Sequence, residues 1–265
     1  MKQTKIKWAT HAWNPIWGCT PESEACTFCY AKRMHERFWD TPFSDIVFHP
    51  ERLGKPGRRK KPSIVFVGNM TDIFHPKVKD EWIDEIINVI LSAPQHTFMI
   101  LTKRAERMEE YFTQKYEELL CDGVDGGLGG KMGDWVIPNL WIGVTVENQK
   151  EGDRRVPLLL RTRAARRFVS MEPLLEEVDM SGYSAPAFST TGMPVLLDLV
   201  IVGGESGESG VVRPMKAEWV EKIFSYCSLN DIPFYFKQWG SSRRDDDRYY
   251  PFEDVQEMPH AQKEA

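Results

Sequence analysis

Residues 63–104 read SIVFVGNMTDIFHPKVKDEWIDEIINVILSAPQHTFMILTKR, with two short apolar runs that flank a longer amphipathic stretch. The runs at 63–68 and 97–102 are rich in β-branched and aromatic residues, as buried strands are. Between them, residues 80–93 place apolar side chains at helical spacing, a stripe that could cover a sheet. This pattern predicts a strand, a helix and a second strand of a parallel sheet.

The same alternation continues in both directions along the chain. A second amphipathic helix is predicted at 217–229, and it places Cys227 on the buried stripe as a small core residue. Further strands are predicted at residues 8–13, 140–146, 167–171, 199–204 and 233–237. The predicted fold class is therefore α/β, with six or seven parallel strands.

Two stretches interrupt this alternation. Residues 121–138 and 181–196 are rich in glycine and small residues, and we expect them to be inserted loops. Beyond residue 240 the sequence becomes polar and charged, which predicts a loosely held tail at 241–265. The predicted organisation is one domain over residues 1–240, large enough to bury a full core, followed by this tail.

Composition argues against two classes of protein. The net charge of -5 and the pI of about 5.8 provide no broad positive field for nucleic acid. The basic run GKPGRRKKP, residues 54–62, is expected to be a solvated loop. No segment approaches the roughly 20 apolar residues of a membrane span, and the start lacks the apolar stretch of a signal peptide. We therefore expect a cytoplasmic protein without membrane partners.

Polar or ionisable residues follow nearly every predicted strand. They read GNMTD, TKR, VEN, MEP, GGESG and KQWG in chain order, after an asparagine and a cysteine-rich loop that follow the first strand. In parallel α/β folds, ligands bind at the carboxyl ends of the strands. A barrel or partial barrel explains so many polar ends at one rim more simply than a doubly wound sheet does.

Three of the five cysteines, Cys19, Cys26 and Cys29, lie within eleven positions. In a reducing compartment this spacing indicates metal or redox chemistry rather than disulfides. Structural zinc would need a fourth ligand, for which His11 and His35 are candidates. An iron–sulfur cluster held by three cysteines would instead leave one iron open to an exogenous molecule. The sequence leaves both alternatives open.

The cysteine loop resembles that of the radical S-adenosylmethionine (SAM) superfamily, since it follows the first strand and has an aromatic residue, Phe28, directly before its last cysteine. The usual spacing there is C-x3-C-x2-C, whereas six residues separate Cys19 from Cys26. A phage-associated, poorly characterised branch has the longer gap, and eight phrases between about residues 8 and 240 resemble it in order: WNPIWGCT, CxxCYA, HPERL, LTKRAERM, IGVTVENQ, FVSMEPLL, IVGGESG and PFYFKQWG. The resemblance to spore photoproduct lyase, which acts on thymine in DNA, is more distant.

This resemblance implies a parallel partial (β/α) barrel of the radical-SAM type. Cys19, Cys26 and Cys29 would bind a [4Fe-4S] cluster whose open iron chelates SAM. An electron from an external donor such as flavodoxin or ferredoxin would cleave SAM to a 5'-deoxyadenosyl radical that abstracts hydrogen from the substrate. Phage carriage would fit a thymidine or another nucleobase as substrate, with DNA or a nucleotide as partner and the host cell cytoplasm as location.

The resemblance also implies roles for residues that follow the strands. Phe28 would lie against the adenine, although it could equally pack the loop onto the barrel. Asn69 and Asp72 would accept hydrogen bonds from the methionine amino group. Lys103 would bind the methionine carboxylate, with Arg104 as competitor.

Two later groups complete the expected site. Thr145 and Glu147 alternate onto one side of their strand and would bond the ribose hydroxyls. A buried Glu147 would need a functional or ion-paired role, because burial of an unpaired carboxylate is costly. Glu172, Glu205 and Lys237 would face the substrate, and ion pairing among the three is the alternative. The competing function is a zinc-binding phage accessory or DNA-associated protein without catalytic activity.

Overall fold

The computed structural model describes residues 1–121, 136–184, 196–208, 211–242 and 248–259. The expected loops at 121–138 and 181–196 lie largely outside these residues, so that part of the domain organisation stays a prediction.

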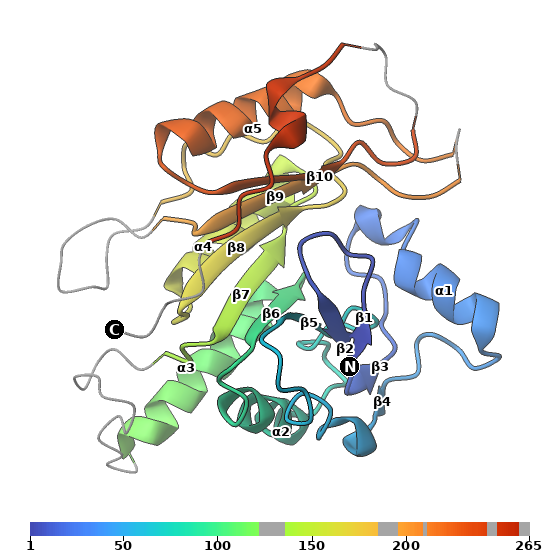
Figure 1. Cartoon of the computed structure of the whole chain (residues 1–265), viewed down its shortest axis with the longest axis vertical. Helices are drawn as coiled ribbons and strands as arrows, with labels where there is room; N and C mark the ends of the chain where they lie inside the picture. Colours follow the sequence, from blue (N-terminus) through green and yellow to red (C-terminus); the bar gives the residue numbers. More distant parts are fainter. Residues whose placement is uncertain (122–135, 185–195, 209–210, 243–247, 260–265) are drawn as a thin grey trace.

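An eight-stranded sheet curves around the middle of the molecule (Figure 1). Its strand order is β1-β2-β5-β6-β7-β8-β9-β10. All neighbours from β2 to β10 pair in parallel, and only the β1 to β2 pair of this sheet is antiparallel. The strands are β1 (Lys2–Gln3), β2 (His11–Trp13), β5 (Ile64–Val67), β6 (Thr97–Thr102), β7 (Leu140–Thr145), β8 (Arg166–Met171), β9 (Leu199–Gly203) and β10 (Phe234–Gln238). The predicted parallel α/β partial barrel is confirmed, with seven parallel strands.

Helices connect the strands and cover the outside of the sheet (Figure 1). They are α2 (Asp80–Leu91), α3 (Ala105–Cys121), α4 (Gln149–Arg161) and α5 (Ala217–Leu229). Both helices predicted from amphipathic spacing are confirmed, and Cys227 is buried on α5. The remaining elements surround the cysteine loop and the C-terminus: β3 (Ile16–Trp17), η1 (Glu24–Cys26), α1 (Tyr30–Phe38), β4 (Val47–Phe48), η2 (Pro50–Arg52) and η3 (Pro251–Asp254).

The two faces of the sheet bury two separate apolar clusters. Residues such as Val65, Ile100 and Val169 point outward and pack against the helices. Their neighbours Phe66, Met99 and Phe168 point inward and form a smaller core inside the barrel. Successive side chains of a strand alternate between faces, so the almost uninterrupted apolar runs in the sequence fill both clusters.

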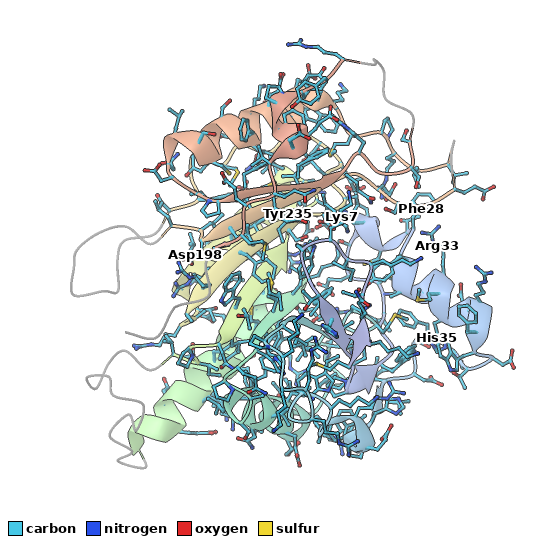
Figure 2. All side chains as sticks on the ribbon, viewed as in Figure 1. Lys7, Phe28, Arg33, His35, Asp198 and Tyr235 are labelled. Carbon is cyan, nitrogen blue, oxygen red and sulfur yellow. The ribbon has the colours of Figure 1, made fainter. Side chains whose placement is uncertain are left out.

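The loop between β1 and β2 fills the barrel interior from its open side. Trp8 is buried and lies against Phe66, with ring centroids 4.7 Å apart. The Lys7 ammonium donates a hydrogen bond to the carbonyl oxygen of Lys237 in the edge strand β10 at 3.0 Å (Figure 2). Strand β2 therefore begins only at His11, since Trp8 turns inward instead of joining the sheet.

The C-terminal segment differs from the expected loosely held tail. Residues 250–257 pack on β10, where the Phe236 amide donates to the Val255 carbonyl at 2.8 Å. Phe252 of η3 is 1% exposed and belongs to the outer core. The mean polarity of the tail concealed two buried rings, Tyr250 and Phe252, whose burial outweighs the cost of ordering a few polar neighbours.

We predict that Phe252→Ala lowers the free energy of unfolding by about 3–5 kcal/mol, because it removes a fully buried aromatic ring. Urea denaturation provides the measurement, with a lower midpoint and an unchanged slope. Tyr249→Ala is the matched control, since that ring is 60% exposed. Equal midpoints for both variants would show that the segment does not contribute to the core.

Candidate functional site

A cavity of about 250 Å³ lies at the carboxyl ends of the parallel strands. The cysteine loop forms one wall, and residues in or directly after the ends of β5, β6, β7, β8, β9 and β10 form the others. The structure brings eleven of the twelve residues predicted from the sequence to this cavity: Cys19, Cys26, Phe28, Cys29, Asn69, Asp72, Lys103, Thr145, Glu172, Glu205 and Lys237. The twelfth, Glu147, lies directly behind Lys103.

The cysteine loop leaves the sheet through a turn that only glycine allows. Gly18 has a φ of 97°, and a Cβ at this position would lie 2.1 Å from the Asp45 carbonyl oxygen. The Cys19 amide then donates to the Phe43 carbonyl at 2.8 Å, which fixes the first cysteine against the β3 to β4 region. Cys29 is the N-cap residue of α1. All three thiols are free and partly exposed.

An ion pair connects this loop to the sheet. The Arg104 guanidinium, just past β6, donates to Asp72 at 3.0 Å and to the Thr20 carbonyl at 3.0 Å. It also lies 4.0 Å from the Cys19 sulfur. Burial raises the pKa of Cys19 to about 11, and the charge of Asp72 acts in the same direction while Arg104 opposes it.

Asp72 is occupied by protein donors. Its two oxygens accept hydrogen bonds from the Phe74 amide, the Thr102 hydroxyl, the Lys103 amide and Arg104. Asp72 lies in the cavity, as the sequence analysis expects. Its hydrogen bonds, however, hold Arg104, which in turn bonds the cysteine loop. The predicted role as an acceptor for a ligand amino group is not tested and stays a prediction.

Asn69 also combines cavity lining with internal contacts. Its side-chain oxygen accepts a hydrogen bond from the Asn14 amide at 2.7 Å, and its backbone carbonyl accepts one from the Tyr30 hydroxyl at 2.5 Å. These contacts join the ends of β2 and β5 to the start of α1. The side-chain amide of Asn69 thereby has a fixed position at the rim.

Glu147 is the centre of a buried ionic network. Its side chain is fully buried and bonds to Lys103 at 2.9 Å, to Arg155 at 2.7 Å and to the Ser23 hydroxyl. Burial by itself would raise the pKa of Glu147. The charges of Lys103 and Arg155 outweigh burial and hold that pKa below its ordinary value of 4.5. The ion-paired role expected for a buried Glu147 is what the structure shows, and its expected bond to a ribose stays a prediction.

Glu172 and Glu205 are also ion-paired, but they do not form a single cluster with Lys237. Lys237 forms an ion pair with Glu172, whereas Glu205 pairs with Arg213. Arg213 also lies over the Phe28 ring, with its guanidinium carbon 5.8 Å from the ring centroid. Phe28 therefore lines the cavity with one side supported by a cation.

Some buried polar atoms around the cavity have no protein partner. Among the described residues these include the Trp8 indole nitrogen, the Ser170 hydroxyl and one oxygen of Glu172. All three side chains line the cavity. Unpaired buried polar atoms are costly in a folded protein, so their presence at a cavity favours a ligand that supplies the missing hydrogen bonds.

Neither histidine considered as a zinc ligand is available to the cysteines. His35 Nδ1 accepts a hydrogen bond from the Trp17 indole at 2.7 Å, and its Nε2 lies 2.7 Å from the Thr41 carbonyl. His11 bonds to its neighbour Thr10 at 3.0 Å and does not line the cavity. Across the described part of the chain, no group of three or more His, Cys, Asp or Glu side chains is arranged to hold a metal ion.

Sequence reasoning missed several residues that build the site. Arg155 is fully buried on α4, on the same stripe as Val156 and Leu159. An arginine on an apolar stripe could have indicated a buried acidic partner. Ser23 and Arg213 gave no comparable signal, because each acts through a contact with a distant part of the chain, Glu147 and Phe28 respectively. Ser170 gave none either, because its hydroxyl has no protein partner.

Three comparisons with known proteins complete the description. A family model described as "Protein of unknown function (DUF5131)" matches residues 3–264. No curated protein matches the chain. The solved structure "Spore photoproduct lyase complexed with dinucleoside spore photoproduct" is similar with a TM-score of 0.43 and 11% identity, over 84% of this chain and 62% of that one. The chain thus spans less than two thirds of that protein's length. In the described residues, no helix has the length and apolar character needed to span a membrane.

We predict that Glu147→Gln lowers the free energy of unfolding by about 3–5 kcal/mol at neutral pH, because Lys103 and Arg155 lose a buried counter-charge. The depressed pKa of Glu147 means that its charge stabilises the fold above pH 4.5, and that this contribution is lost as the pH falls further. Urea denaturation of both proteins at several pH values should therefore show a difference that narrows below pH 4.5.

Glu106→Gln is the control for this experiment. Glu106 bonds to Arg154 at 2.7 Å but is 53% exposed, so its loss should cost less than about 1 kcal/mol. A difference between wild type and Glu147→Gln that stays constant down to pH 3 would contradict the ionic explanation.

Proposed function

The chain belongs to this family of proteins of unknown function, and we propose that it is a radical SAM enzyme in which Cys19, Cys26 and Cys29 hold a [4Fe-4S] cluster. One observation carries the proposal. Three free thiols lie together on the wall of a cavity at the carboxyl ends of seven parallel strands.

The donor set fits such a cluster better than it fits a single zinc ion. Four ligands surround structural zinc at one centre. The three cysteines do not converge in this way, and His11 and His35 are engaged elsewhere. Each thiolate of a cubane binds a different iron, so the three sulfurs can lie further apart than around one ion. A fourth cysteine is not needed, because the open iron takes an exogenous ligand.

When bound, the cluster would supply the electron that cleaves SAM to an adenosyl radical. The chain's own residues would position that molecule. Phe28 offers a ring face to the adenine, and Asn69 offers a fixed amide to the methionine amino group. Lys103 offers an ammonium to the carboxylate, with Glu147 behind it as a buried counter-charge, and Thr145 lines the same cavity.

The barrel interior would hold the substrate below this site. The side chains of Trp8 and Phe66 form an apolar floor that limits access of water from the far end of the barrel. Above the floor, the Ser170 hydroxyl and the unpaired oxygen of Glu172 are available for hydrogen bonds, and Lys237 orients Glu172 through its ion pair.

The finer proposal is that this substrate is a nucleobase or a modified nucleotide in DNA. A flat ring with polar edges matches an aromatic floor with unpaired donor and acceptor groups above it. Glu172, Glu205 and Lys237 would then act at the substrate, as the sequence analysis expects. The acidic charge of the chain provides little general attraction for DNA, so recognition would depend on the cavity itself.

We expect purified protein, reconstituted anaerobically with iron and sulfide, to bind about four irons per chain. Alanine at Cys19, Cys26 or Cys29 should each abolish stable incorporation, because the cluster loses one of only three protein ligands. Cys227→Ala should retain the iron, since Cys227 is buried on α5 away from the cavity. Iron and acid-labile sulfide analysis provide the measurement, and a colourless protein with one zinc per chain would favour the non-enzymatic alternative.

A second experiment addresses SAM itself. Addition of SAM to the reduced, reconstituted protein should change its electron paramagnetic resonance signal, because SAM coordinates the open iron. Phe28→Ala should weaken the apparent affinity by about tenfold or less, as expected for loss of one aromatic contact. Phe38→Ala, an exposed ring on α1, is the control and should leave the titration unchanged. An unaltered signal with SAM would mean that the fourth iron position is already filled.

A further inference from the structure

Exposed apolar side chains concentrate on and beside α1. Of the nine large apolar residues that are exposed in the described part of the chain, five lie between residues 30 and 47. Met34 and Phe38 lie four residues apart on one face of α1, and Trp39 follows directly, whereas Tyr30 lines the cavity. We call Met34, Phe38 and Trp39 the α1 patch. Figure 1 shows α1 at the periphery of the molecule, on the side of β3 and β4 and away from α3 and α4.

The helix that carries the patch is basic although the whole chain is acidic. Helix α1 carries three basic residues, Lys32, Arg33 and Arg37, and one acidic residue, Glu36. The net charge of the whole chain is -5. All four of these side chains are exposed. Arg37 lies over the Phe38 ring at 5.4 Å, so positive charge adjoins the apolar surface directly. Such a combination fits a protein partner with an acidic surface around an apolar centre.

A packed series of aromatic rings joins the patch to the cysteine loop. Trp17 packs on the same small apolar cluster as Cys19 and Cys29. Its ring lies 4.9 Å from Trp39, which in turn lies 5.9 Å from Phe38. His35 fixes this arrangement, since it accepts a hydrogen bond from Trp17 and stacks on Trp39.

The patch is also close to the cysteines along the helix. Cys29 is the N-cap of α1, and a helix of nine residues is about 13 Å long at 1.5 Å per residue. Every residue of the patch is therefore within a short distance of the loop. Electron transfer between proteins needs such proximity and a path through packed atoms.

We infer that the α1 patch is the docking surface for an acidic, one-electron carrier protein that reduces the cluster held by the cysteine loop. This inference rests on the proposed function. In the step itself, the reduced carrier loses one electron and the cluster gains it, with no bond made or broken and no proton transferred. The electron passes through the packed atoms of Trp39 and Trp17.

A second copy of the chain is a poorer occupant of the patch. In a two-fold dimer the same surface faces itself, so the basic residues of both α1 helices would approach one another. Like charges brought together across an interface oppose association, whereas an acidic carrier would neutralise them.

The experiment compares two reductants of the reconstituted protein by anaerobic stopped-flow. Reduced flavodoxin serves as the acidic carrier, and dithionite serves as a small reductant that needs no docking surface. We expect the double variant Arg37→Glu, Phe38→Ala to reduce the rate with flavodoxin by at least about tenfold, because it reverses a charge and removes an exposed apolar contact. The rate with dithionite should stay within twofold of wild type. The flavodoxin rate of wild type should also fall with added salt.

The matched control is Lys60→Glu, Lys61→Glu, two exposed basic residues in the run at 54–62. This variant changes the net charge more than the test variant does, yet it should keep the wild-type rate with flavodoxin. A larger loss in this control than in the α1 variant would place docking elsewhere and overturn the inference.

Other outcomes separate this inference from the function on which it rests. Protein that takes up no iron would overturn both. Iron-loaded protein with unchanged flavodoxin kinetics in the α1 variant would overturn the inference alone. An equal loss with both reductants would show damage to the cluster site instead of lost docking. Light scattering that shows a wild-type dimer and a monomeric α1 variant would assign the patch to a second copy.

Discussion

The ion pair between Arg104 and Asp72 connects the cysteine loop to the barrel. Asp72 follows β5 and Arg104 follows β6, and the guanidinium also holds the Thr20 carbonyl in the loop. The pair is mostly buried, so its charges are weakly screened and its geometry is well fixed. This connection holds the loop directly after Cys19 against the ends of two neighbouring strands.

A second network of buried ion pairs, centred on Glu147, also connects the cysteine loop to the barrel. Glu147 neutralises Lys103 and Arg155 at once, and its hydrogen bond from Ser23 reaches across to the cysteine loop. Charged groups thus fix the loop from two sides, while the floor of the cavity is apolar. Between these ionic groups and the apolar floor, a few buried polar atoms of the described residues have no protein partner. The proposed substrate would lie beside these atoms.

In the proposed function, the cavity on one side of the cysteine loop holds the reacting groups, and the α1 patch on its other side receives the electron. Cys29 lines the cavity and is the N-cap of α1, so the proposed site of chemistry and the proposed entry of electrons lie along one helix. In the proposed function the inner side would limit the access of water to the reacting groups, whereas the outer side presents apolar and basic groups for a transient partner.

The sequence by itself determined the strands, the amphipathic helices and the rim on which polar residues gather, because these follow from local periodicity and from the chain order of a parallel sheet. It therefore predicted which residues line the cavity, including all three cysteines. Only the tertiary structure decided how those residues are paired: Asp72 with Arg104, Glu205 with Arg213, and Glu147 with Arg155. It also decided the inward turn of Trp8 and the burial of Phe252. These contacts join positions on different elements, and no local pattern of residues encodes which charge or ring will meet another across the barrel.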